Sequence, residues 1–126
     1  MIEKLLVDTS AWIDHFKGKA SVVAQAGLDS NIELVTHPMV MVELALGGLA
    51  DESEAMKNLG ELRELKVASF PEILRFIDGR GIRGKGIGYV DVNLLASCVL
   101  DGAALLSFDR KMNDVASEMG ISVYQG

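Results

Sequence analysis

Four acidic residues stand apart from the other charges of this chain. Asp8 and Asp109 each follow an apolar run directly, whereas Glu43 and Asp91 are lone charges within long apolar segments. Burying an isolated carboxylate costs several kcal/mol unless it is paired or bound to a cation. No lysine or arginine lies inside these apolar segments. If the four acids meet in the fold, a divalent cation with oxygen ligands would offset their mutual repulsion.

The residue types also indicate which cation would bind. A set made only of carboxylates suits Mg²⁺ or Mn²⁺ and does not suit Zn²⁺. His15 and His37 are far apart, and with the single Cys98 they give no zinc-binding spacing. Cys98 falls in an apolar helical pattern, which predicts a buried thiol in a reducing cytoplasm.

Each acid also has a simpler explanation. Asp8 and Asp109 could cap the helices that follow them, with Thr9 or Ser10 supporting the first cap. Asp91 would lie in the first turn of its helix, where the helix dipole favours an acid. Glu43 could lie beside a partner interface, but capping cannot explain it, because it falls in the middle of its helix. Taken together, the acids therefore favour a shared site over four separate caps.

The elements that must position these acids alternate along the chain. Apolar runs predict strands at 5–7, 32–36, 67–70, 103–108 and 121–124, and periodic patterns predict helices at 9–17, 19–28, 38–46, 51–64, 71–77, 89–100 and 109–119. This alternation predicts right-handed crossovers and a mainly parallel sheet covered on both faces. We expect an α/β fold, a three-layer α/β/α sandwich with four or five strands. Asp8 and Asp109 would then lie at the same edge, just beyond the carboxyl ends of strands.

Length and composition indicate one domain over residues 1–126. Apolar residues make up 49%, which is enough for one core, and no stretch of about 18 uncharged apolar residues predicts a membrane span. The start of the chain is too short and too acidic for a signal peptide. A net charge of −6 argues against a protein that coats nucleic acid by bulk positive charge, but it does not exclude a nuclease that uses metal ions.

One segment differs from the rest in composition. Residues 79–88, GRGIRGKGIG, form a predicted loop that carries Arg80, Arg83 and Lys85 just ahead of Asp91. The loop could grip RNA phosphates near the metal, or it could be a solvated surface loop. Segment 38–46 is apolar almost all round and predicts a buried helix. Trp12 and Phe16 lie at helical spacing and are predicted to be core residues, with stacking on a base or contact with a partner helix as the alternatives.

These motifs together resemble the PIN-domain ribonucleases, and within them the VapC-type toxins of toxin–antitoxin pairs. The resemblance covers nearly the whole chain. It rests on LLVDTSAWIDHF, VELALGG, GIGYVDVNLLAS and LLSFDRKMNDVA, each of which carries one of the four acids in family order. Two departures are Asn93 and the sequence Ser-Phe-Asp at 107–109, where Thr-X-Asp is common. Neither departure removes a carboxylate.

The resemblance implies a metal-dependent endoribonuclease. Asp8 and Asp91 would be the primary Mg²⁺ (or Mn²⁺) ligands, and Glu43 and Asp109 would complete the site directly or through water. The hydroxyls of Ser10 and Ser107 would orient carboxylates, with capping or turn formation as an equal alternative. The chemistry agrees, because a bound cation lowers the pKa of its water for attack on a phosphodiester.

The same resemblance implies partners and a location. The substrate would be a structured RNA such as a tRNA or an rRNA loop, and a cognate VapB-type antitoxin would inhibit the enzyme. A homodimer is expected, with a heterotetramer or larger assembly when the antitoxin is bound. The protein would be cytoplasmic, with no membrane partner.

Other functions fit the sequence less well. A receiver-like module would need an acceptor aspartate after the middle strand, and residues 67–70 contain none. A dehalogenase-type phosphatase would need a second aspartate two residues after Asp8, where Ser10 stands. The remaining alternative is a catalytically idle PIN-fold module that binds RNA or protein.

Overall fold

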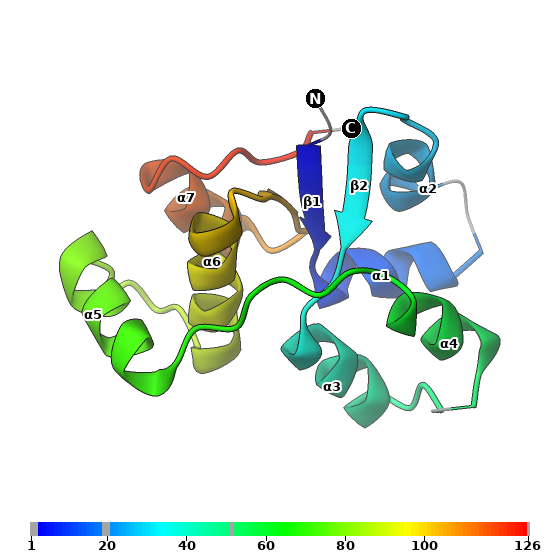
Figure 1. Cartoon of the computed structure of the whole chain (residues 1–126), viewed down its shortest axis with the longest axis horizontal. Coiled ribbons are helices and arrows are strands. Elements are labelled where there is room, and N and C mark those ends of the chain that lie inside the picture. Colours follow the sequence, from blue (N-terminus) through cyan, green and yellow to red (C-terminus); the bar gives the residue numbers. More distant parts are fainter. Residues whose placement is uncertain (1–2, 19–20, 51, 126) are drawn as a thin grey trace.

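The computed structural model describes residues 3–18, 21–50 and 52–125. Its centre is a parallel sheet with the strand order β2-β1-β3. Strand β1 spans Glu3–Val7, β2 spans Ile32–Val35 and β3 spans Ala104–Leu106. Figure 1 shows β1 and β2 side by side and running in the same direction. The predicted α/β class and parallel sheet are confirmed, but the expected four or five strands are wrong, because only three form within the described residues.

The predicted last strand at 121–124 reaches the sheet at one point only. Leu105 N–H donates to Ser122 O at 2.9 Å and Tyr124 N–H donates to Leu105 O at 2.8 Å, which leaves a single parallel bridge between Leu105 and Val123. One bridge does not make a ladder, so residues 121–124 do not form a strand of the sheet.

The predicted strand at 67–70 is also wrong. Phe70 instead begins helix α5, because Ser69 and Glu72 form a capping box at its start. The chain meets the edge of the sheet slightly earlier. Thr36 N–H donates to Arg63 O at 2.9 Å and Leu65 N–H donates to Thr36 O at 2.9 Å, so that Thr36 forms an isolated bridge with Glu64.

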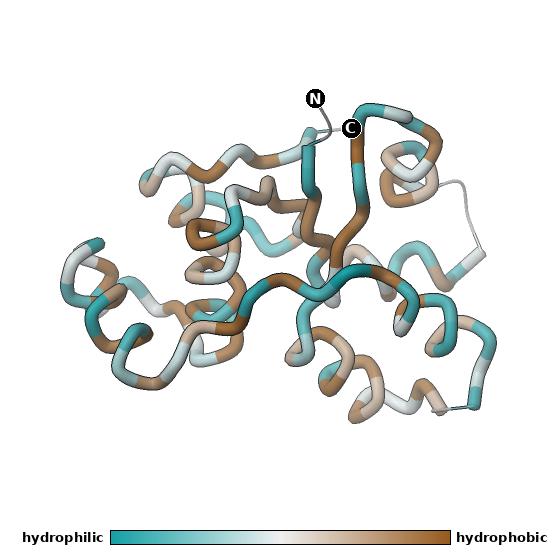
Figure 2. The backbone as a smooth tube through the Cα atoms, viewed as in Figure 1, coloured by the Kyte–Doolittle hydropathy of each residue, from teal (hydrophilic) through white to brown (hydrophobic). Residues whose placement is uncertain are grey.

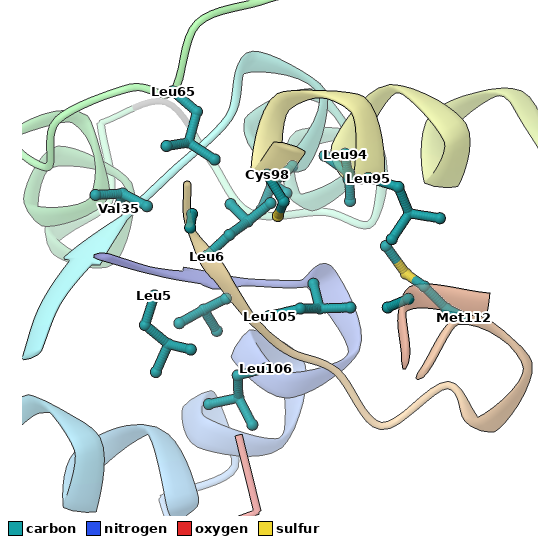
Figure 3. Packing of buried hydrophobic residues seen from close by; sticks show 14 of the residues in the cluster. Leu5, Leu6, Val35, Leu65, Leu94, Leu95, Cys98, Leu105, Leu106 and Met112 are labelled. Atoms are coloured by element: carbon teal, nitrogen blue, oxygen red, sulfur yellow. The ribbon is translucent and has the colours of Figure 1, made fainter. Parts of the chain in front are cut away.

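Helices cover both faces of this sheet. Leu5, Leu6 and Val7 are consecutive and all fully buried, although successive strand residues point to opposite faces. Figure 3 shows Leu6 on the side of β1 where Leu94 and Cys98 lie, and Leu5 on the opposite side. A sheet buried on both faces reads as a continuous apolar run, which is why the first strand was recognisable in the sequence.

The helices of the described part are α1 (Thr9–Phe16), α2 (Val22–Gly27), α3 (Pro38–Leu46), α4 (Glu54–Gly60), α5 (Phe70–Arg80), α6 (Tyr89–Asp101) and α7 (Arg110–Glu118). Seven helices were predicted, and all seven form. The predicted helix at 19–28 starts later, behind a Ser21 cap, and residues 19 and 20 lie outside the described residues. The predicted helix at 51–64 is shorter, because α4 ends at Gly60 and residues 63–65 then pair with Thr36 at the sheet edge; residue 51 also lies outside the described residues.

Helix α3 differs from its prediction as a fully buried helix. Val40 and Leu44 are buried, but Val42 is 56% exposed and Leu46 is 82% exposed. Figure 2 shows hydrophobic colouring along most of α3. Its apolar residues therefore exceed what the core of this chain covers, and one face of the helix carries apolar side chains into solvent.

His37 forms hydrogen bonds with both α3 and α6, the helices that carry Glu43 and Asp91. Its Nδ1 accepts a hydrogen bond from Met39 N–H at 3.1 Å and caps α3. Nε2 must then carry the proton, and it donates to the hydroxyl of Ser97 in α6 at 3.0 Å. Burial lowers the pKa of His37, which favours this neutral form. The histidine is thus a buried link between α3 and α6.

Two smaller expectations concern burial and membranes. Cys98 is buried as predicted, and burial raises the pKa of its thiol to about 12. In residues 3–18, 21–50 and 52–125, no helix is long and apolar enough to cross a bilayer.

Candidate metal centre

The turns that follow β1 and β3 meet at the carboxyl edge of the sheet. Asp8 N–H donates to Leu106 O at 2.9 Å, so the chain just after β1 lies against the end of β3. Both acids at these strand ends do cap helices. The Asp8 carboxylate accepts from Thr9 N–H, and the Asp109 carboxylate accepts from Met112 N–H. Both acids therefore act as helix caps, and both lie at the carboxyl edge of the sheet.

The two helix-borne acids face the same region. Asp91 is in the first turn of α6, and burial raises its pKa from 3.8 to about 6, with further upward contributions from the negative charges of Asp8, Asp109 and Glu43. Direct contacts link the other three acids, because Thr9 contacts both Asp8 and Glu43, and the Ser107 hydroxyl contacts both Asp8 and the backbone N–H of Asp109. The fold thus brings together four acids from the ends of β1 and β3 and from α3 and α6.

Asp8 is the most enclosed of the four acids, with 6% of its surface exposed. Its Oδ1 accepts from Thr9 N–H at 2.7 Å, and its Oδ2 accepts from the hydroxyls of Ser107 at 2.7 Å and Ser10 at 3.2 Å. All three donors are neutral. They fix the orientation of the carboxylate without placing a positive charge beside it.

The two serine hydroxyls also join the turns to each other. Ser10 Oγ accepts from Phe108 N–H at 3.0 Å, and Ser107 Oγ accepts from Asp109 N–H at 3.0 Å. Each hydroxyl therefore donates to Asp8 while it accepts from the backbone of the turn after β3. Ser10 and Ser107 were both predicted to orient carboxylates, and the structure places both in contact with Asp8.

Two further side chains belong to this network and were not predicted as site residues. Thr9 Oγ1 donates to Glu43 Oε1 at 2.6 Å, and Asn113 Nδ2 donates to Ser107 O at 2.9 Å. Asn113 Oδ1 is buried and has no hydrogen-bond partner among the described residues. Thr9 could have been found from its position beside Asp8, whereas Asn113 lies on α7 and gives no local signal.

The donor set fits a hard divalent cation in its chemistry. All four side chains offer carboxylate oxygen, and the protein donors that hold Asp8 and Glu43 are uncharged. In the side-chain positions of the described residues, no three His, Cys, Asp or Glu side chains converge tightly enough to hold one ion. Closure around an ion would therefore need side-chain movements.

The predicted basic loop begins later than expected, since Gly79 and Arg80 belong to α5, which ends at Arg80 and is capped by Gly81 with φ 64°. Arg83 Nη2 lies 3.2 Å from Asp78 Oδ1, and Lys85 Nζ lies 2.7 Å from Glu118 Oε2. Glu118 is the last residue of α7, at the opposite end from Asp109. Both pairs are exposed, and neither cation is paired with one of the four acids.

An apolar groove lies between α1 and α3, and Glu43 is the one acid of the four that lines it. It has a volume of about 240 Å³ and is lined by Ile13, Phe16, Glu43, Leu44, Gly47, Gly48 and Leu49. Ile13 is 49% exposed and Phe16 38%, whereas Trp12 is buried and stacks on Phe16. Trp12 is thus a core residue, as predicted, while Phe16 forms part of the groove wall.

Comparison with known proteins defines the class. The profile described as PIN domain matches residues 5–118. The chain belongs to the PIN domain family. Ribonuclease VapC32 of Mycobacterium tuberculosis is 36% identical over 121 residues, covering 94% of this chain and 95% of the relative. Within the family, this chain is therefore similar to the VapC proteins.

Solved structures agree on the fold. VapBC-1 from nontypeable Haemophilus influenzae matches with a TM-score of 0.71 and 19% identity, covering 97% of both chains. DNA-bound VapBC from Salmonella typhimurium matches with a TM-score of 0.67 and 15% identity, covering 98% of both. FitAcB from Neisseria gonorrhoeae matches with a TM-score of 0.63 and 17% identity, covering 96% of both.

Proposed function

We propose that this protein is a Mg²⁺- or Mn²⁺-dependent endoribonuclease toxin that cleaves structured RNA and is restrained by an antitoxin. The observation that carries the proposal is the meeting of four acids at one sheet edge, where burial and the other three charges raise the pKa of Asp91 to about 6. The similarity to a protein named as a ribonuclease supports the same reaction class. Within the described residues none of the four acids is paired with a lysine or arginine, and a group of unpaired acids in one region favours the binding of a cation.

The proposed roles follow from the positions of the acids. Asp8 and Asp91 are the primary ligands, and Glu43 and Asp109 complete the site directly or through water. When bound, the divalent cation would lower the pKa of a water and neutralise charge that develops on the phosphate. No protein nucleophile is required for this hydrolysis.

The remaining residues support these roles. Ser10 and Ser107 orient Asp8 through neutral hydrogen bonds. Arg83 and Lys85 contact RNA phosphates by exchanging their exposed ion pairs, which stabilise the fold by only about 0–1 kcal/mol each. Arg83 and Lys85 then contribute to RNA binding by counterion release rather than to the reaction itself.

The antitoxin would use the groove between α1 and α3. Its apolar walls suit an apolar peptide face, and Glu43 at its border suits a basic side chain. The VapBC neighbours are named for toxin–antitoxin assemblies, which supports a VapB-type partner for this chain. A homodimer that forms larger complexes with antitoxin in the cytoplasm completes the proposal.

The test compares the wild type with Asp8→Asn. We expect the wild type to bind Mn²⁺ in calorimetry, to cleave tRNA or rRNA only with Mg²⁺ or Mn²⁺, and to arrest growth when expressed alone. Asp8→Asn should lose cleavage and growth arrest while it stays folded. If the wild type binds RNA but neither binds Mn²⁺ nor cleaves, the protein is an idle binding module instead.

A further inference from the structure

We propose that Thr9 is a positioning residue that holds Glu43 in the geometry needed for cation binding. This inference rests on the proposed function, because it assigns a role within the same site. It concerns a hydroxyl that is neither an acid nor one of the two serines that contact Asp8.

Thr9 contacts two of the four acids at once. Its backbone N–H donates to Asp8 Oδ1 at 2.7 Å, and its hydroxyl donates to Glu43 Oε1 at 2.6 Å. Asp8 follows β1 and Glu43 lies in α3, 34 residues after Thr9. One residue at the start of α1 therefore sets the position of one carboxylate relative to the other.

Glu43 depends on this contact more than Asp8 does. Asp8 has three donors, whereas the Thr9 hydroxyl is the one hydrogen-bond donor to the Glu43 carboxylate within the described residues. No lysine, arginine or histidine of that part lies within salt-bridge distance of Glu43. A glutamate side chain has several rotatable bonds, so without a partner it would sample many positions.

A hydroxyl is suited to this task because it is neutral. A lysine or arginine partner would also fix Glu43, but it would neutralise the charge that must attract the cation. The hydroxyl uses Oε1 and leaves Oε2 available. Thr9 lies in the first turn of α1, and the observed hydrogen bond shows that its hydroxyl points from there to Glu43.

The first experiment uses Thr9→Val, which removes the hydroxyl and keeps the shape and the backbone N–H. We expect its dissociation constant for Mn²⁺, measured by calorimetry, to rise about 10-fold, as when partners that orient metal ligands are removed. At saturating Mg²⁺, kcat should fall while KM for RNA stays within about twofold. Thr9→Ser, which restores a hydroxyl, should bind Mn²⁺ within about twofold of the wild type.

Thr36→Val is the matched control. Thr36 is buried, and its Oγ1 has no partner among the described residues, so the same substitution should leave Mn²⁺ affinity unchanged. A second test combines Thr9→Val with Glu43→Gln. If Thr9 acts through Glu43, Thr9→Val should cause no further loss of Mn²⁺ affinity in the Glu43→Gln background. Thermal denaturation of each variant checks folding, and Thr9→Ala replaces Thr9→Val if that variant does not fold.

The outcomes separate this inference from the proposed function. If the wild type binds Mn²⁺ and cleaves RNA, and Thr9→Val does both equally well, the role of Thr9 is refuted and the function stands. Tighter Mn²⁺ binding by Thr9→Val would also overturn the inference, since it would mean that Thr9 holds Glu43 away from the cation. A wild type that neither binds Mn²⁺ nor cleaves RNA refutes both.

Discussion

Ser107 Oγ donates a 2.7 Å hydrogen bond to Oδ2 of Asp8, across 99 positions of the sequence. The same oxygen accepts from Asp109 N–H at 3.0 Å. A single buried hydroxyl thus links one acid to the backbone of another and holds the ends of β1 and β3 together.

Removing this hydroxyl should destabilise the fold. Ser107→Ala leaves the Asp109 N–H without its acceptor and removes one of three donors from the buried Asp8 carboxylate. We expect a loss of about 2 kcal/mol in the free energy of unfolding, measured by urea denaturation. Ser122→Ala, at an exposed position, is the control and should change stability by less than about 0.5 kcal/mol. If Ser107→Ala and Ser122→Ala were equally stable, the hydrogen bonds of Ser107 would not contribute to the stability of the fold.

Asp91 should make the cation-free protein less stable at neutral pH. Its pKa is raised to about 6 in the fold, so the folded state favours the protonated form. The stabilising contribution is complete below about pH 4 and is lost as pH rises through about 6. Asp91→Asn should therefore be more stable than the wild type by about 1–2 kcal/mol at pH 8, after allowing for partial solvent screening, with little difference at pH 4.

The measurement is thermal denaturation from pH 4 to pH 8 in EDTA, followed by the same series with Mn²⁺. At about 100 times its dissociation constant, a bound cation should stabilise the wild type by about 2.7 kcal/mol. It should not stabilise Asp91→Asn, and its effect on the wild type should weaken below pH 6 as Asp91 becomes protonated. If Mn²⁺ stabilised Asp91→Asn as much as the wild type, Asp91 would be excluded as a ligand.

His37 should give a pH dependence of the opposite sign. Burial lowers its pKa below 6.5, so the folded state favours the neutral ring. Its contribution is complete above pH 6.5 and is lost as pH falls through the lowered value, because a protonated ring cannot accept from Met39 N–H. His37→Asn keeps a capping side chain but loses the contact with Ser97, and it should reduce stability by about 1–2 kcal/mol at pH 7.5.

The same substitution should also flatten the decline in stability between pH 6.5 and pH 4.5. The readout is the midpoint of urea denaturation at several pH values, with His15→Asn as the control on the same scale. Within the described residues, the His15 side chain forms a hydrogen bond only with Ser21 and none with α3 or α6. If the stability of His37→Asn fell between pH 6.5 and pH 4.5 as steeply as that of the wild type, groups other than His37 would cause the decline.

Arg83 and Lys85 should contribute to RNA affinity and little to the chemical step. The double substitution to alanine should weaken RNA binding at low salt and reduce the slope of log affinity against log salt by about 1–2. At saturating RNA, kcat should stay within about twofold. Fluorescence anisotropy at several salt concentrations measures this, and Arg63→Ala, whose side chain pairs with Glu33, serves as the control.

A substitution that leaves the salt slope unchanged would mean that the two cations stay in their ion pairs with Asp78 and Glu118. The loop would then be a solvated surface loop, which was the alternative left open by its sequence.

The sequence alone determined most elements and the positions of the four acids along them. The apolar run before Asp8 and the one before Asp109 predicted strands because a strand buried on both faces has no polar side. The helix after Gly88 was predicted from its long apolar pattern. These signals are local, and local propensity is what a sequence displays directly.

Only the tertiary structure decided which edge strands form and which hydroxyls hold the acids. Residues 121–124 have a strand-like pattern, but β3 offers them a single bridge at Leu105. Thr9 and Asn113 join the network through contacts with residues that are distant in sequence or on another element. Such pairings depend on where two elements meet. The position of Thr9 beside Asp8 marks it as a candidate, but no spacing within α1 or α3 reveals its contact with Glu43.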